Sequence, residues 1–165
     1  MYRYLFEENC FNRIFEVNKK INLNVQKKVK DILADILKIK YEDIQVVYYK
    51  KTEKSLEFKL ETEKKIGENF VFRVCVEITE FDSTYISLDT FISRTVPVNL
   101  AGPVTTEDVF SNLVQEFSKK TFYVDMMADY KLKYEELSKE IFEGLEMLFG
   151  FENVYQITTI DNKKE

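Results

Sequence analysis

The sequence predicts an α+β domain with an N-terminal helix, a four-stranded antiparallel β-meander, and two C-terminal helices packed on one face of the sheet. Three observations predict it. Apolar and polar residues alternate in successive segments between residues 44 and 92, short connections separate these segments, and apolar residues recur every three or four positions before and after them. The 165 residues contain no visible linker or repeat, so 1–165 is expected to fold as one domain.

The four strands are expected to begin near residues 44, 56, 70 and 85, and the alternation is clearest in the last three. Each connection is short enough for a hairpin, so consecutive strands should pair as a meander. Gly67, in the second connection, is available for a positive φ angle. In the first strand, Ile44, Val46 and Tyr48 are expected on one face, which leaves Val47 and Tyr49 on the other.

Helical spacing of apolar residues predicts helices over residues 24–38, 105–117 and 125–149. Asn24 and Thr105 are the residue types expected at the N-caps of the first two. Glu107 and Asp108 lie in the first turn after Thr105, where the positive end of a helix dipole favours acidic residues.

The remaining segments are less regular. Residues 1–20 fit two interpretations, because the aromatic residues near the start would align on a strand, whereas those between residues 11 and 15 suit a helical turn. Residues 94–103 contain both prolines and are expected to cross from the sheet to the helices. Residues 154–160 could add an edge strand, and 161–165 are expected to be a solvated tail.

Composition limits the function classes. The net charge is −5 and the basic residues are dispersed, whereas nucleic-acid binding requires concentrated cationic surface, so direct nucleic-acid binding is not expected. No apolar run could span a bilayer and no signal peptide is recognisable, which favours a cytoplasmic protein with no membrane partner. Cys10 and Cys75 are expected to be reduced thiols.

The sequence lacks the residues of the common catalytic designs. There is no histidine, two cysteines cannot form a standard zinc site, and the four glycines are isolated. We therefore expect no catalytic residue, no bound metal and no cofactor. The alternative is carboxylate chemistry: Asp43 followed by Glu57 and Lys59 resembles the pattern of metal-dependent nucleases, in which two carboxylates hold Mg²⁺ and a lysine positions the attacking water. Plain alternation on the wet face of a strand explains the same residues.

The second face of the sheet is the main candidate for binding a partner. Its candidate partner-binding residues are Val47, Tyr49, Val71, Arg73, Tyr85 and Phe91. Aromatic and apolar residues inside a charged rim are typical of a contact surface. The alternative is that the aromatic N-terminal segment folds over this face.

A second candidate is the acidic face of the last helix, which includes Glu136, Glu140 and Glu143. Such a face would dock on a basic groove of a partner, or it would serve only to keep the protein soluble.

These observations favour a non-catalytic protein-binding accessory protein, such as an adaptor, chaperone or inhibitor. Heavy use of Lys, Ile, Asn, Phe and Tyr suggests the AT-rich genome of a bacterium, an archaeon or a virus, and we favour a bacterium or its virus. The partner would be another protein, including a basic nucleic-acid-handling one or a second copy in a homodimer. The alternatives are the nuclease and a structural subunit of a larger assembly. The expected plan resembles that of several bacterial chaperones, including SecB-like ones, although the long N-terminal segment departs from it and architecture does not give function.

Overall fold

The computed structural model describes residues 2–17, 24–97, 106–149 and 154–157. In chain order, the elements are β1 (Tyr2–Val17), α1 (Val25–Leu37), the short 3-10 helix η1 (Tyr41–Asp43), β2 (Gln45–Lys51), β3 (Leu56–Lys65), β4 (Phe70–Glu80), β5 (Thr84–Pro97), α2 (Thr106–Phe149) and β6 (Val154–Ile157).

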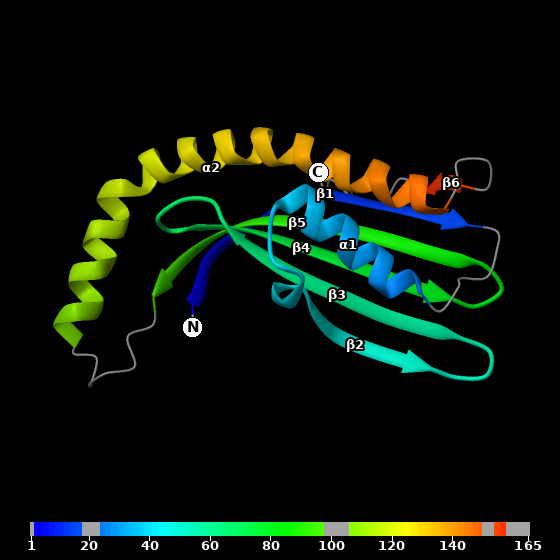
Figure 1. Cartoon of the computed structure of the whole chain (residues 1–165). Coiled ribbons are helices and arrows are strands. Elements are labelled where there is room, and N and C mark those ends of the chain that lie inside the picture. Colours follow the sequence, from blue (N-terminus) through cyan, green and yellow to red (C-terminus); the bar gives the residue numbers. More distant parts are fainter. Residues whose placement is uncertain (1, 18–23, 98–105, 150–153, 158–165) are drawn as a thin grey trace, which may run out of the picture.

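The strands form one antiparallel sheet, and the two longer helices pack on it (Figure 1). Five strands run in the order β2-β3-β4-β5-β1, and the short β6 pairs with the outer side of β1. The α+β class and the meander from β2 to β5 are therefore confirmed. The sheet is wider than predicted because the N-terminal segment belongs to it.

β1 resolves the two interpretations of the N-terminal segment in favour of a strand. It pairs with β5 along its length, from Tyr2 opposite Pro97 to Val17 opposite Thr84. The expectation of a helical turn near residues 11–15 is wrong, and the segment does not fold over the second face. Register shifts after Tyr4 and after Asn9 disturb the alternation, and for this reason the period-2 pattern is hard to recognise in the sequence.

The C-terminal half differs from the prediction in two ways. β5 continues to Pro97, so residues 94–97 are strand and not yet a crossing. α2 is one helix of 44 residues instead of two, because residues 118–125 contain neither glycine nor proline to end it. Its first turns angle past the end of the sheet and its later turns lie across it (Figure 1). The predicted N-cap Thr105 lies outside the described residues.

α1 agrees with the prediction. Asn24 occupies the N-cap position, although its side chain makes no capping hydrogen bond. Lys38 ends the helix in the left-handed conformation, with φ of 55°. The ammonium group of Lys64 in β3 donates a hydrogen bond of 2.7 Å to the carbonyl oxygen of Leu37, which satisfies one of the carbonyls left free at a helix end.

The core lies between the sheet and the two helices. Its largest fully buried side chains are Phe15, Leu33, Leu37, Phe58, Leu60, Phe70, Phe72, Ile78, Ile86, Leu88, Ile92 and Ile141. Aromatic pairs join the layers, such as Phe72 of β4 with Tyr134 of α2 at 4.8 Å between ring centres. A polar contact is also buried there, with 2.8 Å between the hydroxyl oxygens of Thr90 and Ser138.

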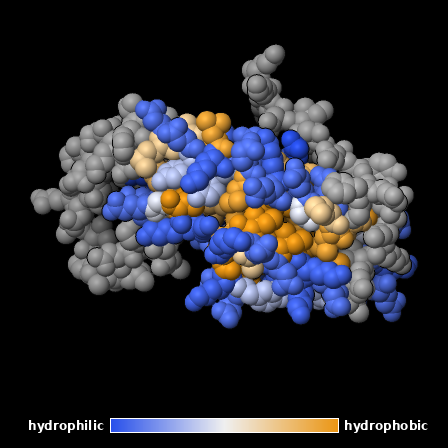
Figure 2. All heavy atoms as spheres, turned by 45° about the horizontal axis from the view of Figure 1, so that its top comes forward, coloured by the Kyte–Doolittle hydropathy of each residue, from blue (hydrophilic) through white to orange (hydrophobic). Residues whose placement is uncertain are grey.

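The outer side of the helices is mostly hydrophilic, with a smaller hydrophobic area near its middle (Figure 2). Within the described residues, no helix combines the length and the apolar character needed to cross a membrane.

The second connection of the meander uses its glycine differently from the prediction. Gly67 does not have a positive φ angle. A Cβ atom at this position would lie 2.6 Å from the phenol oxygen of Tyr130, so the glycine allows α2 to approach the β3–β4 turn closely.

Candidate protein-binding surface

Both α1 and the later turns of α2 lie on one side of the sheet, and no described helix packs on the other side (Figure 1). We call that other side the open face. Strand register assigns residues to it, because directly opposed residues of neighbouring antiparallel strands point to the same side. Glu57, for example, is opposite Thr79, and Thr79 is opposite Tyr85.

Negative charge predominates on the open face. The carboxylates at its register positions are Glu7, Glu16, Glu57, Glu61, Glu63, Glu77 and Asp89, and the cations are Lys50, Lys59, Lys65 and Arg73. The excess of carboxylates gives this side of the protein a negative potential, which attracts basic groups and repels phosphates.

Arg73 organises the centre of the open face. One guanidinium nitrogen lies 2.7 Å from a carboxylate oxygen of Glu7, and another lies 3.6 Å from Glu61. The guanidinium carbon lies 4.9 Å from the ring centre of Phe91. Ser93 donates a further hydrogen bond of 2.9 Å to Glu7. The charge of Arg73 is therefore balanced within the chain, and these contacts fix the beginning of β1 against β4 and β5.

The apolar members of the open face are shielded. Val71 and Cys75 are only 6% and 7% exposed, and Phe91 is half-buried beneath Arg73. Tyr85 remains 39% exposed. Of the predicted contact residues that lie on this face, Tyr85 thus offers the largest accessible ring, and most of the rest of the surface is polar.

The predicted faces of β2 are wrong beyond Val46, because the strand contains a bulge. The register shifts between Val46 and Tyr48, which leaves Val47 without an opposed residue in β3. Tyr48 is opposite Lys59 and lies on the open face, where its hydroxyl donates a 2.8 Å hydrogen bond to Glu57. Tyr49 is opposite Phe58 and lies on the helix-covered side. The strand contains no glycine or other local sequence signal that would mark the extra residue.

The two cysteines lie on opposite sides of the sheet. Burial raises the pKa of the Cys75 thiol to about 11, so the thiol is protonated at neutral pH and is a poor nucleophile. Burial also raises the pKa of Cys10, whose sulfur lies 3.2 Å from the carbonyl oxygen of Lys131 in α2. Both are free thiols.

The three residues of the nuclease pattern do not come together. Gln45 is opposite Glu61 and Lys50 is opposite Glu57, so Asp43 and Glu57 lie at opposite ends of the β2–β3 hairpin. The main-chain carbonyl of Asp43 accepts a 3.1 Å hydrogen bond from the Thr62 hydroxyl. Among the residues that the structure describes, no group of three potential metal ligands is close enough to hold an ion.

The acidic positions on α2 form a separate surface. Glu136, Glu140 and Glu143 are exposed on the helix-covered side of the molecule. Lys139 lies 3.3 Å from Glu136 and 3.9 Å from Glu135, so cations are interspersed with the carboxylates here. Exposed pairs of this kind contribute little stability.

Asp89 provides a pH-dependent test of the open face. Burial raises the pKa of its carboxyl above the ordinary value of 3.8. Because the folded state binds this proton more tightly, the group's stabilising contribution is complete below the unfolded-state pKa and is lost as pH rises through the folded-state pKa. Asp89→Asn should therefore raise the melting temperature at neutral pH; the gain in the free energy of unfolding should stay below about 1 kcal/mol, because solvent screens a half-exposed carboxylate. Thermal unfolding at neutral pH and below pH 3.8 would check this; an equal gain at both pH values would contradict it.

No known protein family matches this chain, and no characterised protein is similar enough in sequence to count as a relative. The fold and the surface therefore define only a class: an α+β protein with an antiparallel sheet, covered by helices on one side and open and acidic on the other.

Proposed function

We propose that this chain is a non-catalytic accessory protein that acts by binding a basic protein partner on the open face. The observation that supports this proposal is the excess of carboxylates on a broad sheet face where no described helix packs. A cytoplasmic adaptor, chaperone or inhibitor of a bacterium or its virus would use such a surface.

The arrangement of the carboxylates suits a basic surface more than a single ion. Glu63 and Glu77 are exposed on neighbouring strands, and Glu57 is half-buried beside Tyr48. Spread over the sheet, these groups steer a cationic partner by long-range attraction and set its orientation. Tyr48 and Tyr85 add exposed rings in neighbouring rows of the open face, on β2 and β5, and aromatic rings are enriched among the residues that dominate binding energy. A protein that handles nucleic acids has a basic channel of the required sign.

Comparative capture tests this proposal. Wild type and an open-face variant, Glu57→Lys/Glu63→Lys/Glu77→Lys, are immobilised and exposed to lysate of the native host. Bound proteins are then quantified by mass spectrometry. We expect one or a few proteins with basic surfaces to bind wild type and to be depleted about tenfold or more on the variant, because three attractive charges become repulsive. Moderate salt should elute the same proteins from wild type, because salt screens the attraction between exposed charges.

The chain offers a matched control. Glu136→Lys/Glu140→Lys/Glu143→Lys makes the same charge change on α2, on the helix-covered side. Capture on this control should equal wild type. Loss of the captured proteins on the α2 variant, with retention on the open-face variant, would move the binding surface to α2. Equal capture on all three proteins would contradict the proposal.

A further inference from the structure

β2 forms one outer edge of the sheet and is unusually exposed. All seven of its residues are exposed, and its one strand neighbour among the described elements is β3. An edge strand presents a row of main-chain N–H and C=O groups that can pair with another strand. At the other edge of the sheet, the outer side of β1 is already paired with β6.

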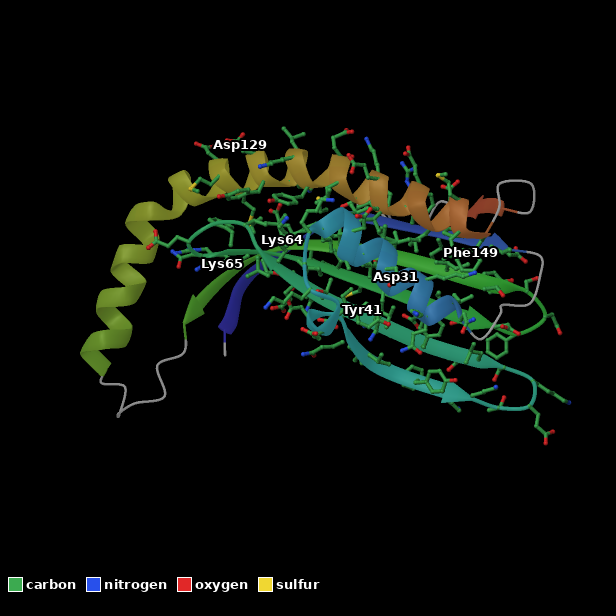
Figure 3. All side chains as sticks on the ribbon, in the orientation of Figure 1. Asp31, Tyr41, Lys64, Lys65, Asp129 and Phe149 are labelled. Atoms are coloured by element: carbon green, nitrogen blue, oxygen red, sulfur yellow. The ribbon has the colours of Figure 1, made fainter. Side chains whose placement is uncertain are left out.

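Exposed large apolar side chains concentrate at this edge. Five of the nine in the described residues lie in or beside β2, namely Tyr41, Val46, Val47, Tyr48 and Tyr49. Tyr41 lies beside α1, with the ammonium of Lys30 4.9 Å from its ring centre (Figure 3). The centre of β2 therefore has high β-propensity and carries none of the charges or prolines that normally protect an edge.

Charge is divided between the two ends of this edge. Glu42 and Asp43 immediately precede β2, and Lys50 and Lys51 end it. All four are exposed. Parallel pairing of two such strands would set like charges together, whereas antiparallel pairing sets the acidic end of each beside the basic end of the other. The strand is thus complementary to a second copy of itself.

We propose that β2 pairs antiparallel with β2 of a second copy of this chain, so that the two sheets become one continuous sheet across a two-fold axis. The bulge determines the register. It puts Gln45 and Tyr48 on the same face, so Gln45 can lie opposite the partner's Tyr48. The same register brings Asp43, which ends η1 just before β2, near the partner's Lys50 and places Val47 next to the two-fold axis.

This dimer goes beyond the proposed function and does not depend on it. A two-fold axis perpendicular to the sheet leaves both open faces on the same side and so doubles the continuous acidic surface. Because a single edge strand with few side chains buries less area than a standard interface, we expect a reversible dimer with a dissociation constant on the order of micromolar.

Charge reversal with rescue tests the proposal by analytical ultracentrifugation over a range of protein concentration. Wild type should show a monomer–dimer equilibrium. Lys50→Glu/Lys51→Glu should raise the dissociation constant about tenfold or more, and Glu42→Lys/Asp43→Lys should do the same, because each leaves like charges opposed. Combining all four substitutions should restore dimerisation. Lys27→Glu/Lys28→Glu, an equal charge change at exposed positions of α1, should have no effect.

A second variant acts at the centre of the contact. Val47 is 55% exposed, so Val47→Lys should fold normally, as checked by circular dichroism, yet it sets two like charges close to the axis and should give a monomer. A wild type that stays monomeric at every concentration would overturn the proposal. A dimer whose dissociation constant these variants leave unchanged would also overturn it. So would a variant with all four charge reversals that remains monomeric. Binding of a basic partner by the monomeric variants would show that the proposed function stands separately.

Discussion

Replacement of Phe15 by alanine is expected to lower the free energy of unfolding by about 3–5 kcal/mol. The side chain is fully buried and connects β1 to α2. Its ring meets the rings of Phe142 and Phe149 edge to face, at 5.3 and 5.9 Å between centres. Truncation therefore removes buried apolar area and both aromatic contacts, and leaves a cavity where the N-terminal strand meets the helix.

Urea unfolding followed by circular dichroism measures this loss. Phe81→Ala is the matched control, because Phe81 follows β4 and is 50% exposed, so its truncation should change the stability by no more than about 0.5 kcal/mol. If Phe15→Ala cost no more than the control, β1 would not be part of the folded core.

Gly144→Val is expected to lower the free energy of unfolding by about 1–3 kcal/mol. At Gly144, α2 passes close to α1: a Cβ atom there would lie 3.2 Å from Cγ2 of Ile32 and 3.5 Å from Cδ1 of Ile36. The two γ-methyl groups of valine would force the helices apart.

Gly144→Ala is the control in the same urea experiment. Alanine gains about 1 kcal/mol of helix propensity over glycine, which offsets the tight contact of a single methyl group, so its net effect should be small. Equal stability of the valine variant and wild type would contradict the close packing of α1 on α2.

The sequence predicts the parts of the fold that depend on local periodicity. The strands from β3 to β5 and helix α1 follow directly from the spacing of apolar residues. The sequence leaves β1 ambiguous between strand and helix because two register shifts interrupt its alternation. The sequence predicts two helices where the structure has α2 alone, because the apolar stripe is interrupted although nothing between residues 118 and 125 breaks a helix.

The candidate surface depends on contacts between residues that are far apart in the sequence. Arg73, which lies over the ring of Phe91, is held in place by Glu7, which is 66 positions away in the chain. The faces of Tyr48 and Tyr49 depend on one unpaired residue, Val47. Neither the ion pair nor the bulge has a local sequence signal, so the acidic character of the open face could be predicted only after the strands were in register.

Carboxylate footprinting of the complex with a purified captured partner tests the central claim most directly. Carbodiimide-driven labelling of each acidic side chain is measured by mass spectrometry with and without the partner. The open-face account predicts that the partner lowers labelling of Glu57, Glu63 and Glu77 while Glu136, Glu140 and Glu143 on α2 are labelled as before. Protection of the α2 carboxylates with unchanged labelling of the open face would contradict it.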